Sequence, residues 1–160
     1  MARWAMAHPC RMQSIEPNVR ARKFSLLVGR TACQCCQALI EVGALWLDEF
    51  EDLDGQAMDP GGAATLSYME WLEAKPLAAC QGRLPGLRMA STRMSGTTYL
   101  ANHCLICGSV QGAPFVHGPD GPFWPDADES LAAGIRKFDF AVPLSAVASI
   151  SQATWMDRVG

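Results

Sequence analysis

Two Cys-x-x-Cys pairs constrain the fold of this chain more than any other feature of its sequence. The first pair is Cys33 with Cys36, the second is Cys104 with Cys107, and 67 residues lie between them. Two cysteines at this spacing can bind one ion when the backbone between them turns tightly, and four thiolates form the tetrahedral shell that zinc prefers. The four cysteines are therefore predicted to bind one structural zinc ion.

Length and composition favour a single, mostly β domain. The chain has 160 residues and is 49% hydrophobic, which suits one buried core of ordinary size. Only 18% of the residues are charged, and 14 glycines and 10 prolines separate short apolar runs, as in a fold with many turns and strands. We predict one mostly β domain over residues 23–160. An α+β arrangement also fits, whereas an all-helical bundle does not.

Each cysteine pair is predicted to occupy the turn of a β-hairpin. Residues 24–28 read as a strand that leads into the first pair, and apolar residues alternate beyond it over residues 38–46. Residues 97–101 lead into the second pair in the same way, and residues 109–116 follow as a return strand despite Pro114. The expected fold is zinc-ribbon-like, with two hairpins separated by a long insertion.

The segments outside these hairpins are less regular. Residues 65–75 fit either a helix or a strand, and Pro76 is expected to end that element because proline disfavours helical geometry in the residue before it. Residues 138–142 are predicted to form a strand. A short helix over residues 129–137, which Asp128 could cap, is expected to precede it.

Charge separates the start of the chain from the rest. Residues 1–23 carry five basic side chains and one acidic side chain, a formal charge of +4, whereas the remainder carries −7. We predict that residues 1–22 form a basic, flexible tail. An organellar transit peptide and an extension upstream of a start at Met12 are the alternatives. The acidic body argues against a surface that binds nucleic-acid phosphates, so nucleic acid is a disfavoured partner.

Cysteine usage and hydropathy indicate the compartment. Seven cysteines are an odd number, and the apolar run at residues 4–7 is too short for a secretory signal. No uninterrupted apolar stretch approaches the roughly 18 to 20 residues that a membrane-spanning helix needs. We predict a cytoplasmic protein without a membrane contact, whose reduced thiols are available for a metal.

The cysteine pattern favours a structural ion over a catalytic or redox site. Four thiolates close the coordination shell and leave no position for an activated water. None of the three histidines is followed two residues later by glutamate, as a zinc deaminase requires. A thioredoxin-like site needs one pair at the start of a helix, and neither pair precedes a clear helical pattern.

Cys35 or His103, each adjacent to a predicted ligand, could replace one of the four predicted cysteine ligands. Cys10 and Cys80 are expected to be incidental thiols.

Two loops are candidates for a partner surface. Residues 48–54 are acidic and are expected to form a solvated loop, because they lack the residue order of an EF-hand. After the second cysteine pair, His117, Asp120, Phe123 and Trp124 belong to a segment rich in glycine and proline. We predict a possible interaction surface at these four residues, since rigid aromatic groups bind partners at low entropic cost. The alternative is that Phe123 and Trp124 fold back over the core.

Two stretches carry a family resemblance: Tyr-Leu-Ala-Asn-His-Cys-x-x-Cys-Gly-x-x-Gln-Gly at residues 99–112 and Gly-Pro-Phe-Trp-Pro at residues 121–125. Together with Ala-Leu-Trp at residues 44–46, they resemble a family of uncharacterised bacterial proteins with a split four-cysteine zinc ribbon. The resemblance implies the fold and the zinc, and it supplies no catalytic residue. The additional Cys35 departs from the single first pair of that family.

Three classes of function follow from these features. The first is a structural-zinc module that binds another protein through one of the two loops. The second is nucleic-acid binding through the basic tail and the ribbon, which predicts an affinity that depends strongly on salt. The third, an enzyme with an unrecognised pocket, requires a concave site with titratable groups away from the four cysteines. No catalytic residue is assigned, and a binding module is favoured over an enzyme.

Overall fold

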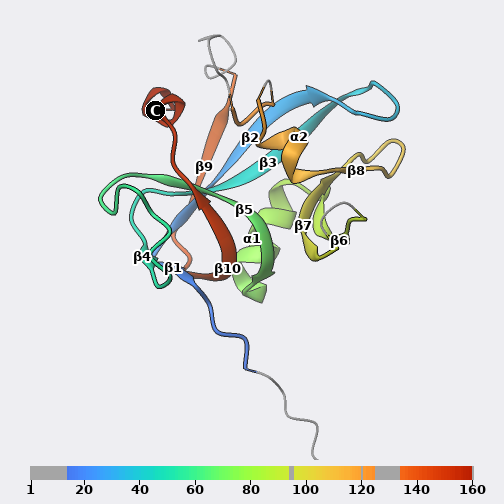
Figure 1. The fold of residues 1–160 in the computed structure, drawn as a ribbon. Helices are drawn as coiled ribbons and strands as arrows, with labels where there is room; N and C mark the ends of the chain where they lie inside the picture. The colour runs from blue at the N-terminus through green and yellow to red at the C-terminus, as the bar shows by residue number, and fades with distance from the viewer. Residues whose placement is uncertain (1–13, 94–95, 120, 125–133, 160) are drawn as a thin grey trace, which may run out of the picture.

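Two antiparallel β-sheets form the framework of the protein in a computed structural model, which describes residues 14–93, 96–119, 121–124 and 134–159. The larger sheet has seven strands in the order β4-β1-β10-β5-β3-β2-β9 (Figure 1). Its strands are β1 (Val19–Ala21), β2 (Phe24–Ala32), β3 (Leu39–Leu47), β4 (Glu51–Asp52), β5 (Ala64–Leu72), β9 (Arg136–Phe140) and β10 (Leu144–Ser151).

The smaller sheet has three strands in the order β6-β7-β8. They are β6 (Leu87–Ser91), β7 (Thr98–His103) and β8 (Val110–Gln111), and the helices are α1 (Ala74–Arg83), α2 (Ala113–Val116) and the 3-10 helix η1 (Thr154–Arg158). The mostly β fold predicted from composition is confirmed. Within the described residues, no helix has the length and apolar character needed to cross a membrane.

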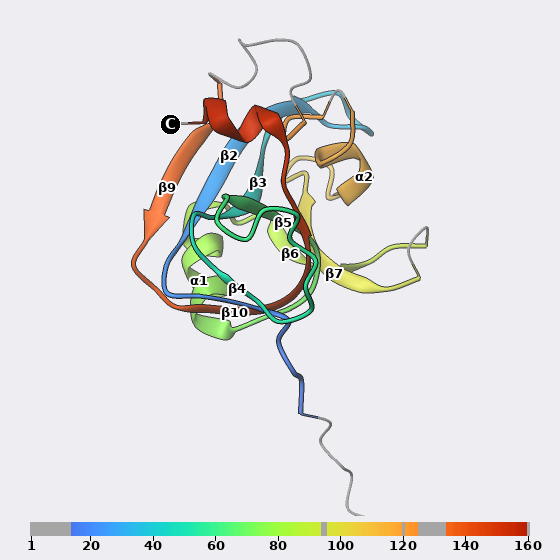
Figure 2. The same cartoon turned by 60° about the vertical axis from the view of Figure 1, so that its left-hand side comes forward.

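The central strands of the larger sheet are buried on both faces. Successive side chains of a strand point to opposite sides, so one strand can serve two cores. In β2, Leu26 packs in a cluster that contains the α1 residue Cys80, whereas Leu27 packs in a cluster that contains the α2 residue Val116 and the η1 residue Trp155. Figure 2 shows α1 on one side of the sheet and α2 with η1 on the other.

One asparagine joins the two sheets. The Asn102 side chain in β7 accepts a hydrogen bond from the Gly43 amide at 2.8 Å and donates to the Gly43 carbonyl at 3.0 Å. The side chain of β3 is absent at this point, and a Cβ atom on Gly43 would lie 2.6 Å from a methyl carbon of Leu84 and displace it. The Asn102 side chain is buried, and it satisfies both the amide and the carbonyl of Gly43 that face β7. These two hydrogen bonds set the position of β7 against β3.

Each predicted hairpin is present, and its turn contains a cysteine pair. Strands β2 and β3 are antiparallel from Ser25↔Trp46 to Ala32↔Leu39, and the first pair lies between them. Strands β7 and β8 pair through Asn102↔Gln111 and His103↔Val110, with the second pair in their turn. The return strand predicted over residues 109–116 is limited to β8, because Pro114 lies in the first turn of α2, where its missing amide hydrogen costs nothing.

Other elements differ from the sequence predictions. The ambiguous segment at residues 65–75 is mainly strand β5, which ends before Pro76, and the helix α1 that starts at Ala74 includes this proline in its first turn. The helix predicted over residues 129–137 is wrong at its end, since Arg136 and Lys137 belong to β9. Residues 129–133 and Asp128 lie outside the described residues.

The sheet also begins earlier than the predicted domain boundary at residue 23. Val19 to Ala21 form β1, which pairs with β10 and with β4, and the Val19 side chain is buried. The predicted tail over residues 1–22 therefore contributes a strand to the domain. Its residues 1–13, with Met12 and Cys10, are outside the described residues.

Candidate metal centre

The first cysteine pair lies in a tight turn at the end of β2. The Cys33 amide donates to the Ala38 carbonyl at 2.8 Å, and the Gln37 amide donates to the Cys33 carbonyl at 3.0 Å. Gln37 closes the turn in the left-handed region, with φ of 62°. This backbone folds Cys33 and Cys36 onto the same side of the turn, so their Sγ atoms lie within 4.8 Å of each other.

The second pair repeats this turn at the end of β7. The Cys104 amide donates to the Ser109 carbonyl at 2.9 Å, and the Gly108 amide donates to the Cys104 carbonyl at 2.8 Å. Gly108 has φ of 77° and occupies the position that Gln37 holds in the first turn. The glycine that follows the second pair thus has the positive φ expected from the sequence.

The two turns bring four sulfur atoms together at one end of the molecule. The Sγ atoms of Cys33 and Cys107 are 3.7 Å apart, and those of Cys36 and Cys104 are 3.8 Å apart. All four lie within 4.8 Å of one another. In Figure 1 the β2–β3 and β7–β8 turns project in the same direction. The predicted set of four cysteines is close enough to hold one metal ion.

Hydrogen bonds and the neighbouring thiols shift the pKa values within this cluster in opposite directions. The Ser109 hydroxyl, followed by the backbone amide of Cys36, lowers the pKa of Cys33 to about 5. The Ala38 amide lowers the pKa of Cys36, but desolvation and the other sulfur atoms outweigh it and raise that pKa to about 12. Four negative sulfur atoms at such distances repel one another, so a cation is needed for all four to ionise together.

The side chains of Gln111 and Ser109 form hydrogen bonds to the sulfur atoms of the cluster. The Gln111 carbonyl oxygen accepts from the Gln34 amide in the first turn at 3.0 Å, and its Nε2 lies 3.4 Å from the Cys33 sulfur and 3.0 Å from the Ser109 hydroxyl oxygen. The Ser109 hydroxyl lies 3.2 Å from the Cys33 sulfur and 3.1 Å from that of Cys107. Gln111, which is 1% exposed, therefore links the two turns through a polar network that donates to the sulfur atoms.

The alternative ligands considered from the sequence lie outside the cluster. Cys35 is exposed, and the charge of Cys107 raises the pKa of its thiol. The Nδ1 atom of His103 lies 3.0 Å from the Ala101 carbonyl and 3.1 Å from the Gly86 carbonyl, so this ring is held by backbone groups. Cys80 is buried in α1, and burial raises its pKa to about 12.

Replacing Gln37 by glycine is expected to stabilise the protein by about 0.5–1 kcal/mol, because a left-handed conformation costs a residue with a Cβ about 1–2 kcal/mol and part of this gain is lost to chain entropy. Gly108→Ala should have the opposite effect, for the same reason. A Cβ at Gly108 would meet no atom within 4 Å, so the change there tests conformation alone. Urea unfolding of both variants measures the difference, and a shift of the same sign in both would contradict the equivalence of the two turns.

The predicted interaction surface is only partly exposed. Phe123 is 2% exposed and packs over Gly29, where a Cβ would lie 3.6 Å from the Phe123 ring, whereas Trp124 is 39% exposed. The His117 ring lies 5.7 Å from that of Phe123, and burial lowers the pKa of His117 to about 4. Asp120 lies outside the described residues. Trp124 is therefore the described aromatic residue of this segment that a partner can reach.

A larger exposed apolar surface surrounds the cysteine turns. Leu39 is 68% exposed, Leu105 is 67% exposed and Ile106 is 71% exposed. All three border a shallow hollow of about 250 Å³, together with Pro85. We call Leu39, Leu105 and Ile106 the apolar tips. They were not singled out from the sequence, although Leu105 and Ile106 occupy the two central positions of a Cys-x-x-Cys turn.

Comparison of the chain with family models, curated proteins and solved structures finds no match.

Proposed function

We propose that the four cysteines bind one structural zinc ion. With zinc–sulfur bonds of about 2.3 Å, a regular tetrahedron has edges of about 3.8 Å. The two closest sulfur pairs, at 3.7 and 3.8 Å, match that edge. A small contraction of the longer separations would complete the tetrahedron. Four sulfur ligands favour zinc over harder cations, which prefer oxygen.

The role proposed for this centre is structural, in a module that binds another protein. Four thiolates leave no coordination position for a substrate or an activated water, so the ion would hold the two turns together without taking part in a reaction. The observation that supports protein binding is the exposure of the apolar tips. Large aliphatic side chains that gather on a surface are typical of interaction sites, and here the metal would fix their positions.

Site-specific photo-crosslinking in cells tests this proposal. A benzoylphenylalanine at Ile106 should form a discrete covalent adduct with a partner protein, because this tip would lie at the centre of the contact. The same probe at Met58, which is 93% exposed on a distant loop, serves as the matched control. Leu105→Asp should abolish the Ile106 adduct while the metal content and the unfolding midpoint of the protein stay unchanged.

Two outcomes would overturn protein binding through the apolar tips. Equal adduct patterns from Ile106 and Met58 would mean that the tips have no specific partner. An adduct that nuclease treatment removes and that weakens steeply with salt would instead support nucleic-acid binding, the second class considered from the sequence.

A further inference from the structure

A hollow of about 460 Å³ lies beside the first cysteine turn, whose Gln34 lines it, and none of the apolar tips borders it. Besides this turn, its walls come from β5 and from the small sheet with α2, and its lining is mostly apolar. Tyr68, Tyr99, Val110 and Pro114 are the residues with an apolar body that line it. Sites for small molecules have volumes of about 300–1,000 Å³ and apolar walls with a few polar groups, so this hollow is of the right size and character.

The backbone of Tyr68 is strained in a way that presents its ring to the hollow. Tyr68 has φ of 46°, although it lies within strand β5 and carries a bulky side chain. The pairing of β5 with β10 is irregular here, with a register shift between Val147 and Ser149. Such bulges redirect side chains, and strained residues concentrate at functional sites. Tyr68 is 37% exposed, so a ligand can reach it.

Tyr99 is a buried aromatic residue that packs against Tyr68. Its ring centroid lies 5.3 Å from that of Tyr68 at an interplanar angle of 60°, and its hydroxyl oxygen accepts a hydrogen bond from the Ala113 amide at 3.2 Å. Tyr99 is 2% exposed, so α2 and β5 hold it in place. The two rings lie edge to face, and because Tyr99 is buried, the Tyr68 ring is the one against which a flat ligand can bind.

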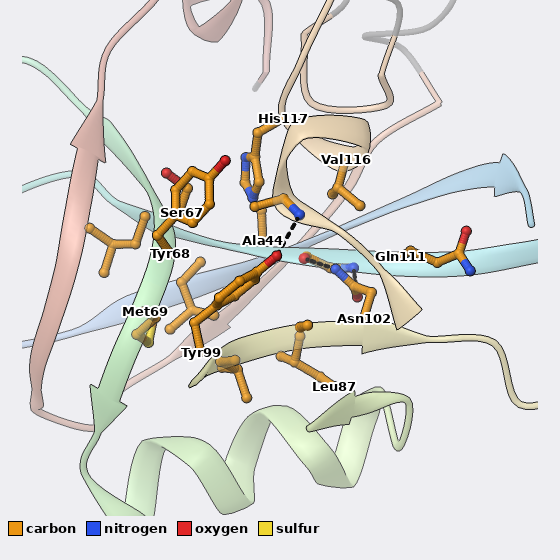
Figure 3. A pocket seen from close by; sticks show the side chains of 16 residues that line it. Ala44, Ser67, Tyr68, Met69, Leu87, Tyr99, Asn102, Gln111, Val116 and His117 are labelled. Carbon is orange, nitrogen blue, oxygen red and sulfur yellow. Dashed lines mark hydrogen bonds between the residues drawn. The ribbon is translucent and has the colours of Figure 1, made fainter. Parts of the chain in front are cut away.

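The hollow ends at these two tyrosines. Behind them is a cavity of about 20 Å³, which shares Tyr68 and Tyr99 with the hollow and is also lined by Asn102 and His117 (Figure 3). That space is sufficient for about one water molecule and too small for a ligand. A bound molecule would therefore stay in the outer hollow, against the Tyr68 ring.

The charge of the Arg93 side chain indicates which planar ligands the hollow favours. Arg93 is the one charged side chain among the described residues that line the hollow, and no carboxylate is found among them. A guanidinium group binds carboxylates and phosphates, and it disfavours a cationic ligand. We propose that the hollow binds a planar aromatic molecule that carries an anionic group, with its ring against Tyr68 and its anion near Arg93.

Titration of the metal-loaded protein by two-dimensional amide NMR tests this proposal with a matched pair of probes. Indole-3-propionate and tryptamine share one ring system and carry opposite charges. Indole-3-propionate should shift the amide signals of Tyr68, Tyr99 and Gly112 and should bind at least about tenfold more tightly than tryptamine. Arg93→Gln should remove most of this difference in affinity.

Two variants separate the ring of Tyr68 from its structural role. Tyr68→Gly removes the ring and places at this position a residue that adopts positive φ without strain, so the fold should be kept and the affinity for indole-3-propionate should fall at least about tenfold. Tyr68→Phe keeps the ring and should bind as the parent does. Equal affinities for the two indoles, unchanged binding by Tyr68→Gly, or signal shifts confined to Leu105 and Ile106 would each overturn the proposal.

Discussion

Cys104→Ser is expected to lower the free energy of unfolding of the metal-loaded protein by about 4 kcal/mol or more, since loss of a structural metal is among the few single changes of that size. Cys104 is buried, and its sulfur lies 3.8 Å from that of Cys36 within the four-cysteine cluster. A serine hydroxyl is not ionised at neutral pH and is a poor ligand for zinc. The midpoint of thermal unfolding, followed by circular dichroism, should fall by about 8–16 °C for a chain of this length.

Cys35→Ser is the matched control for this variant. Cys35 belongs to the first turn and undergoes the same chemical change, but it is exposed and its sulfur is outside the cluster. Its replacement should change the free energy of unfolding by no more than about 0.5 kcal/mol, as at most surface positions. If both variants lost the same stability, Cys35 would have to be counted among the ligands. If neither lost any, the cluster would not contribute to folding.

Asn102→Ala is expected to lower the free energy of unfolding by about 3 kcal/mol, because it leaves two buried backbone groups of Gly43 without partners, at about 1–3 kcal/mol each. The Gly43 amide and carbonyl lose bonds of 2.8 and 3.0 Å at the junction of the two sheets. Since β3 starts after the first cysteine turn and β7 ends at the second, the variant should also weaken metal binding. Urea unfolding with and without a chelator measures both effects.

Asn18 provides a control of the same chemistry. Its side chain accepts from the Ala148 amide at 3.0 Å and donates to the Ala148 carbonyl at 2.9 Å, at a partly exposed place in the larger sheet. Water can replace the missing partner there, so Asn18→Ala should cost about half as much or less, and metal binding should not change. If Asn18→Ala lowered the free energy of unfolding more than Asn102→Ala, the hydrogen bonds at the junction of the two sheets would not have the stabilising role assigned to them.

The four-cysteine cluster could be predicted from the sequence because the geometry of each pair is local. A Cys-x-x-Cys turn places two sulfur atoms on one side whatever the rest of the chain does, so Cys33 with Cys36 and Cys104 with Cys107 needed only to be brought together. The alternation over residues 38–46 was also informative, because Ile40, Val42, Ala44 and Trp46 do share one face of β3 and one core cluster. Both signals are local. The first depends on the spacing of two cysteines within one turn, and the second on the alternation of side chains along one strand.

The helix α1 could not be predicted because its own sequence gives little sign of it. Glu73 makes no side-chain capping bond, the first turn has no acidic residue, and Pro76 lies near its start. Packing holds the helix in place, through Cys80 and the following Leu84 against the central strands. Strand β1 was missed for a similar reason, since its three residues are stabilised by pairing with β10 and β4.

The apolar tips and the aromatic hollow could not be predicted from the sequence, because both depend on tertiary structure. The exposure of the apolar tips follows from how two turns distant in sequence meet, and nothing in the local pattern distinguishes Leu39 from a core residue. The positive φ of Tyr68 depends on an irregular pairing with β10, whose residues lie about eighty positions further along the chain. The burial of Phe123 in the core cluster that contains Val116 and Trp155 likewise could not be chosen over exposure from its loop sequence.

Metal content and thiol reactivity test the central assignment most directly. The protein is purified without added metal, analysed for its elements, and titrated with a thiol reagent before and after chelation. We expect one zinc ion per chain and about four additional reactive thiols once the chelator removes it, as for a closed four-cysteine site. Protein that contains no metal and whose cysteines are oxidised in pairs would contradict the metal centre and would make the two turns a redox site instead.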